Sequence, residues 1–216
     1  MNDSSDDQRI IEITHELCHQ MDIASLIPKK VVWADIIALS KGSMKVGSDE
    51  CVTNGEIVLP ERIRGKLRPD EWTPIIASAL AFERKLKRRV MGHQLRRFFL
   101  PGFLPLALIV LVLMISNPDQ AYGVMGLLIS GIIILLFLTK YLSASYVRSM
   151  RLQADRMAAD LVGRDKMIDV LRKIDEMKLK DVEKRKRGGL KVRFSSRPTI
   201  TERNRNLLAQ PLGKLA

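Results

Sequence analysis

The residues best suited to chemistry lie near the start of the chain, where His15, Glu16 and His19 form the pattern H-E-x-x-H. On a helix, residues four positions apart share one face, so both imidazoles could bind one zinc ion while Glu16 polarises a zinc-bound water. The chain contains three histidines in all, and no third ligand follows at a recognisable spacing. The pattern therefore allows a zinc hydrolase site, but it also fits a surface helix without any metal.

The elements that would position such a site are short strands and amphipathic helices, recognised from the spacing of their apolar residues. The predicted strands are 31–33, 36–39 and 56–59, and the predicted helices are 8–21, 61–67, 71–97, 143–161, 167–177 and 201–208. The sequence thus predicts an α+β protein that is mainly helical.

A long apolar stretch, residues 98–138, contains a single formal charge, Asp119. A turn signal at 117–120 divides the stretch into two runs of about 19 residues, each long enough as a helix to cross a bilayer. Helices in soluble cores usually keep a polar stripe, and these runs have none. The pattern predicts a two-helix transmembrane hairpin at 98–139, flanked by the two halves of one cytoplasmic domain, 1–97 and 140–216, with a mobile basic loop at 178–193.

The net charge of +12 is concentrated beside the predicted hairpin and in residues 178–193. By the positive-inside rule, both termini are expected in the cytoplasm, with the hairpin in the plasma (inner) membrane and anionic lipid headgroups as partners. Nucleic acid is the rival partner for such charge, but the basic runs have little aromatic interleaving.

The first residues are acidic and polar, so no signal peptide is predicted, and the hairpin itself would direct insertion. Cys18 and Cys51 are expected to be reduced, buried thiols.

Several short stretches also follow one another in a characteristic order: I-V-L-P at 57–60, L-R-P-D-E at 67–71, I-I-A at 75–77, Q-A-D at 153–155 and R-P-T-I-T-E-R at 197–203. With the membrane hairpin between them, they resemble the HtpX-like and CAAX-prenyl-protease-like integral-membrane zinc metallopeptidases. The resemblance implies a zincin-type scaffold, in which one helix carries H-E-x-x-H and binds zinc.

The zinc-binding residues implied by this resemblance are replaced in the present sequence. Ser78, Ala79 and Phe82 stand where the family has its histidine, glutamate and second histidine. Arg151 stands in place of the third ligand, a glutamate, and so brings a permanent cation to where a dication would sit. Arg197 replaces the histidine of a late His-Pro turn. The resemblance therefore predicts a scaffold from which the conventional zinc site is missing.

The scaffold residues are kept more closely. Asp155 resembles the structural aspartate of the family, with Arg151 or Arg203 as its possible partner. We therefore expect a catalytically inactive relative without a cofactor, which binds a protein or peptide partner or acts as a regulatory or scaffold subunit at the membrane. The alternative is an active membrane zinc metalloendopeptidase that uses His15, Glu16 and His19. If the resemblance is false, the chain is a basic helical membrane protein of another kind.

Overall fold

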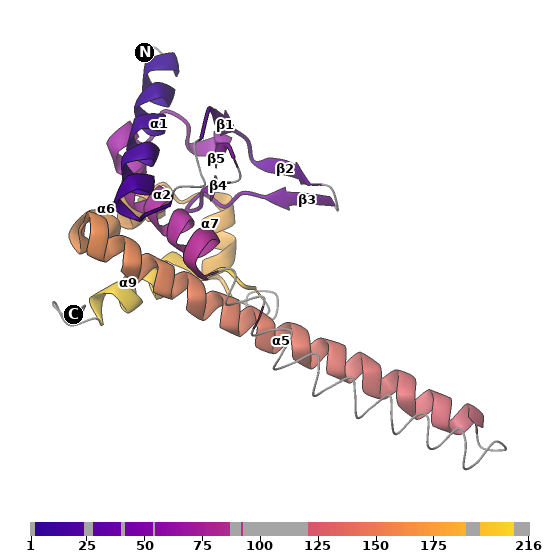
Figure 1. The fold of residues 1–216 in the computed structure, drawn as a ribbon. Helices are drawn as coiled ribbons and strands as arrows, with labels where there is room; N and C mark the ends of the chain where they lie inside the picture. Colours follow the sequence, from indigo (N-terminus) through magenta and orange to yellow (C-terminus); the bar gives the residue numbers. More distant parts are fainter. Residues whose placement is uncertain are drawn as a thin grey trace.

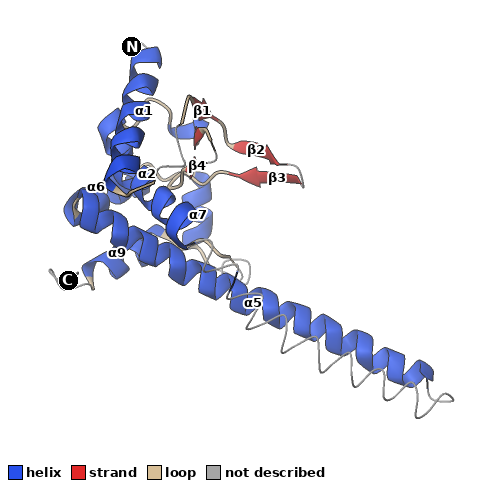
Figure 2. Cartoon of the chain, viewed as in Figure 1, coloured by secondary structure: helices blue, strands red, loops and turns tan. Residues whose placement is uncertain are grey.

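The computed structural model describes residues 3–23, 28–39, 42–53, 55–86, 92, 121–188 and 195–209. These residues form a mainly helical α+β structure, as predicted, in which a globular part carries one long protruding helix (Figure 1). The strands lie together on one side of the globular part, and helices make up the rest of it (Figure 2).

The strands form two small sheets. The first sheet has the order β1 (Val31–Trp33), β5 (Ile57–Leu59) and β4 (Val52–Thr53), with β1 parallel and β4 antiparallel to β5. The second is an antiparallel hairpin of β2 (Ile36–Leu39) and β3 (Gly42–Lys45). The three predicted strands are therefore confirmed, apart from a one-residue difference at the start of β5, whereas β3 and β4 were not predicted.

The helices pack around one apolar core, in which α2 lies against the inner part of the long helix α5. Ala154 and Ala158 of α5 are fully buried there, and their small side chains let α2 approach closely. Gly163 separates α5 from α6 with a φ of 99°, a conformation that L side chains rarely adopt. The helical elements are α1 (Asp3–Gln20), η1 (Glu61–Ile63), η2 (Pro69–Trp72), α2 (Thr73–Leu80), the π-helical turn η3 (Ala81–Leu86), α5 (Ala121–Val162), α6 (Arg164–Glu176), α7 (Lys180–Lys186) and α9 (Ile200–Leu208).

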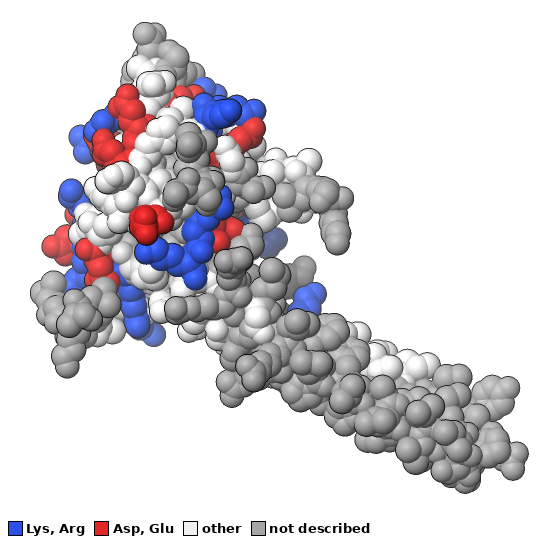
Figure 3. Space-filling view, viewed as in Figure 1, with Lys and Arg blue, Asp and Glu red and all other residues white. Residues whose placement is uncertain are grey.

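The outer part of α5 protrudes from the globular part and exposes large apolar side chains, among them Ile134 and Phe137. Charged side chains gather on the globular part, whereas the few described side chains visible near the end of α5 are uncharged (Figure 3). Among the described residues, one helix is long and apolar enough to cross a membrane, over Ile129–Val162. It corresponds to the second arm of the predicted hairpin; the first arm and its turn lie outside the described residues.

Three sequence predictions need correction. The basic loop predicted at 178–193 is wrong for Lys180–Lys186, which form α7, because Asp181 and Arg185 are held by ion pairs; residues 189–193 lie outside the described part. The helix predicted at 61–67 is a single 3₁₀ turn, η1. The first helix starts at Asp3 rather than at position 8. In α7 and at the start of α1, charge and polarity suggested mobility, but Asp181, Arg185 and Asp7 have fixed partners in the structure.

Candidate functional site

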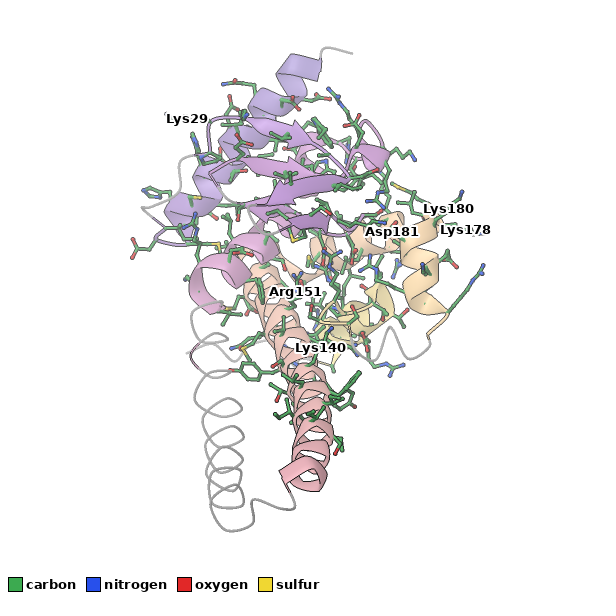
Figure 4. The ribbon with its side chains drawn as sticks, turned by 90° about the vertical axis from the view of Figure 1, so that its right-hand side faces the viewer. Lys29, Lys140, Arg151, Lys178, Lys180 and Asp181 are labelled. Atoms are coloured by element: carbon green, nitrogen blue, oxygen red, sulfur yellow. The ribbon has the colours of Figure 1, made fainter. Side chains whose placement is uncertain are left out.

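A small cavity brings together the four positions at which the resemblance places zinc ligands and the catalytic base. Ser78 and Ala79 of α2, Phe82 of η3 and Arg151 of α5 all line this cavity, whose volume is about 70 Å³. In Figure 4, Arg151 lies on α5 where this helix reaches the globular part. Residues 73 positions apart in sequence, from Ser78 to Arg151, thus face the same space.

Asp155, one turn beyond Arg151, is buried at the floor of the cavity. Arg203 of α9 donates two hydrogen bonds to its carboxylate, from Nε to Oδ2 at 2.8 Å and from Nη2 to Oδ1 at 2.6 Å. The hydroxyl of Ser78 donates a third, also to Oδ1, at 2.6 Å. Of the two partners predicted for Asp155, Arg203 is the one that binds it in the structure.

Arg203 also ties this floor to the loop between β3 and β4. Its Nη1 donates to the backbone oxygen of Asp49 at 2.8 Å and lies 3.2 Å from the Asp49 carboxylate. Arg185 of α7 pairs with the same carboxylate. Asp181, one turn earlier on α7, accepts from the backbone and hydroxyl of Ser48 at 3.0 and 2.7 Å. The loop is therefore held from two helices.

A second pair of arginines converges on Glu50. Arg151 Nη1 lies 2.9 Å from Oε1, and Arg197 Nη1 lies 3.1 Å from Oε2. The guanidinium of Arg151 also stacks over the Phe82 ring, 4.7 Å from its centroid. We call the whole set the arginine–carboxylate network: Arg62, Arg151, Arg185, Arg197 and Arg203 with Asp35, Asp49, Glu50, Asp155 and Asp181.

The electrostatics of the network favour its charged form. Burial opposes ionisation of Asp49, but Arg185 and Arg203 outweigh it and lower the pKa of the Asp49 carboxyl. Burial likewise disfavours the charged form of Arg203, but Asp155 and Asp49 raise its pKa further above the ordinary range. Burial raises the pKa of Cys51, which also lines the cavity, so this thiol is neutral. A neutral thiol is neither a nucleophile nor a good metal ligand.

The residues around the cavity do not fit the zinc ion that the resemblance implies. Ser78, Ala79 and Phe82 offer no imidazole or carboxylate, and Arg151 adds a fixed positive charge. The nearby carboxylates, those of Asp155 and Glu50 among them, are already engaged by arginine. Across the described residues, no three His, Cys, Asp or Glu side chains are grouped so that they could hold a metal ion.

The structure places the H-E-x-x-H motif elsewhere. His15 and His19 lie on the exposed face of α1, and His15 Nε2 lies 3.2 Å from the backbone oxygen of Pro28. Glu16 borders a separate groove of about 690 Å³, which α1, α2, α5 and α6 enclose. The residues that line the cavity do not include these three.

Comparisons of the chain with known protein families, with characterised proteins and with solved structures found no match. The resemblance to membrane metallopeptidases therefore stays a prediction, resting on the sequence stretches that suggested it.

Sequence reasoning missed Asp49, Glu50, Arg185 and Asp181 as members of the site. Asp49 and Glu50 lie between the predicted strands 36–39 and 56–59, within a short polar stretch, S-D-E, and a pair of acids there looks like an ordinary solvated turn. Arg185 was one cation among many in a basic run. The sequence contains more basic than acidic residues, 36 against 24. This excess does not show which arginine is buried.

The network predicts an acid-sensitive fold. Burial opposes ionisation of Asp181, but hydrogen bonds from Ser48 and the charges of Arg62 and Arg185 lower its pKa. The pKa of an aspartate carboxyl in an unfolded chain is about 3.9. Stabilisation by Asp181 is therefore complete at neutral pH and is lost as the pH falls below about 4. Asp181→Asn should lower the free energy of unfolding at neutral pH and flatten its decline in acid.

Urea unfolding followed by tryptophan fluorescence, repeated over a series of pH values, measures this difference. Asp169→Asn is a matched control, because Asp169 is exposed on the neighbouring helix α6. If Asp181→Asn and Asp169→Asn gave the same pH profile, the network would not carry the acid sensitivity.

Proposed function

We propose that this protein is an integral-membrane relative of the zinc metallopeptidases that has exchanged its zinc site for a structural ion network and works as a regulatory or scaffold subunit without proteolysis. In this proposal the hairpin at 98–139 anchors the chain in the plasma membrane, and both termini are cytoplasmic. The long apolar helix α5 and the basic flanks of the apolar stretch support the anchor.

The observation that carries the proposal is the position of Arg151. Its guanidinium lies between Glu50 and the ring of Phe82, at the cavity that Ser78 and Ala79 also line. A metal-activated water needs an open coordination position and a general base. Here a permanent cation, an aromatic ring and a methyl group stand at the corresponding places. Arg151, Phe82 and Ala79 offer no coordination position for a metal ion and no general base to activate water.

The cavity is too small to hold a peptide. Its size therefore favours a regulatory or scaffold role in which any partner binds elsewhere on the protein. A volume of about 70 Å³ has room for a few water molecules, because about 10–15 Å³ of such space is enough to hold one. A polypeptide partner would instead bind the outer surface, where the groove between α1 and α6 is about ten times larger. Its lining mixes apolar side chains with charges of both signs.

An active zinc endopeptidase is the second candidate, favoured by the literal H-E-x-x-H pattern on α1. His15, Glu16 and His19 would then be the two ligands and the base. Their exposure on one helix face leaves them accessible to a metal ion. A third protein ligand would have to come from residues outside the described part or from a partner.

Metal analysis of the detergent-purified protein distinguishes the two candidates. Our proposal predicts no bound zinc, both in the unchanged chain and in a His15→Ala, His19→Ala variant. It also predicts that Glu16→Gln changes no proteolytic activity in the preparation, because nothing in the proposal depends on this carboxylate. Near-stoichiometric zinc that disappears in the double variant would overturn the proposal, especially if Glu16→Gln abolished cleavage of a test substrate.

A further inference from the structure

The β2–β3 hairpin projects from the globular part of the protein. Within the described part of the chain, its two strands pair with each other and with no further strand. Figure 1 shows the hairpin pointing toward the same side as the outer part of α5. Two-stranded hairpins are at best marginally stable in water unless one face packs against another surface. The stability of the hairpin therefore depends on what its two faces pack against.

The strand register divides the hairpin into two faces. Ile37 pairs with Met44 on the inner face, where both are partly buried and Met44 lines the cavity of the arginine–carboxylate network. Ile36 pairs with Lys45 on the outer face, where Ile36 keeps 56% of its surface exposed. The outer face, made by Ile36, Ala38, Ser43 and Lys45, is exposed at every position.

The charge of this region is positive. The sequence from 36 to 48 contains two lysines and no acidic residue. The acids on either side are neutralised, because Asp35 pairs with Arg62 at 2.8 Å and Asp49 pairs with Arg185 and Arg203. An exposed isoleucine beside a lysine, without a competing carboxylate, is the chemistry that suits the boundary between anionic headgroups and acyl chains.

We infer that the outer face of the β2–β3 hairpin lies on the anionic surface of the membrane that α5 enters. The inference rests on the proposed membrane span of α5, which fixes the side on which the bilayer lies. Ile36 enters the acyl boundary and Lys45 reaches the phosphates, so that lipid covers the face that the protein leaves open. The contact gives the globular part a fixed orientation, with the cavity beside the membrane.

Spin labels on single cysteines test this contact in the full chain, in vesicles that contain phosphatidylglycerol, with Cys18 and Cys51 replaced by alanine. The label positions are Ile36→Cys in the hairpin, Ile134→Cys on the outer part of α5, where the side chain is exposed, and Lys29→Cys, which lies at the end of the globular part away from the protruding end of α5 (Figure 4). At Ile36→Cys and Ile134→Cys, collisions with oxygen should rise and collisions with a water-soluble nickel chelate should fall severalfold relative to Lys29→Cys. Introducing Lys45→Glu should return the Ile36→Cys label to the values of water.

The outcomes separate this inference from the proposed function. If the label at position 134 reports lipid while the label at 36 matches position 29, the contact of the β2–β3 hairpin is refuted and the membrane span stands. If position 134 also reports water, the span fails. Shielding of position 36 from both collision partners would mean that protein covers the hairpin, which also refutes the contact.

Hydrogen exchange of the unsubstituted chain in nanodiscs gives a second measurement that needs no labelled variant. Amides of 36–45 should exchange several times more slowly with anionic than with zwitterionic lipid. Equal rates would contradict the inference.

Discussion

Replacing Arg203 by methionine is expected to destabilise the protein by about 3–5 kcal/mol, which is the usual cost of removing one partner from a buried ion pair. The Arg203 side chain is 6% exposed and contacts the carboxylates of Asp155 and Asp49, both of which are 2% exposed. Without the guanidinium, two buried carboxylates lose a shared cation. Methionine keeps much of the side-chain volume, so the loss measures charge and hydrogen bonding rather than a cavity.

Thermal or denaturant unfolding of the detergent-purified variants checks this prediction. Arg205→Met is the matched control, because Arg205 is exposed on the same helix, α9. Arg203→Lys should recover part of the stability, because an ammonium keeps the charge but cannot make the two parallel hydrogen bonds to Asp155. If Arg203→Met unfolded at the same point as Arg205→Met, the network would not be a stabilising element.

Introducing the zinc-binding residues that the resemblance implies is expected to create a metal site. A variant with Ser78→His, Ala79→Glu, Phe82→His and Arg151→Glu should bind about one zinc ion per chain, because it supplies three ligands and a base around one cavity. Arg151→Glu removes the cation and adds the third ligand. Asp155 keeps its two hydrogen bonds from Arg203 in this variant, so the floor of the site stays in place.

The control keeps Arg151 and carries the other three substitutions. It should bind zinc much more weakly, because it has one ligand fewer and a positive charge beside the ion. Elemental analysis with a spectroscopically active Co²⁺ substitute measures both occupancy and geometry. A folded four-site variant that binds no metal would show that these positions lack zincin geometry, and the resemblance would then be false.

Much of the fold was predictable because its elements have strong local patterns. The strands β1 and β2 and the final helix α9 have β-branched runs or a capping box that act over a few residues. The apolar run of α5 needs no tertiary information to be recognised. The π-helical turn at Ala81–Leu86 was not predictable in this way, since the sequence there continues an ordinary helical pattern.

The candidate site was predictable only where a motif marked it. The resemblance pointed to Ser78 and Arg151, which do line one cavity. It gave no indication of Glu50, 101 positions before Arg151, because ion pairs between distant residues leave no periodic signal. The helix α7 was missed for the same reason. Its charges suggest a solvated loop until their partners, Asp49 and Arg62, are known.

The contact between Arg203 and Asp49 also sets an order of events during synthesis. The two residues lie 154 positions apart, and α9, which supplies the arginine, is the last described helix to leave the ribosome. Before α9 is synthesised, Asp49 can pair with Arg185 but not with Arg203. Asp155 lacks the two hydrogen bonds that Arg203 donates. Domains tend to complete their packing once all segments are present. A nascent chain that stops before α9 would thus leave the carboxylates of Asp49 and Asp155 without the guanidinium that they share in the folded protein.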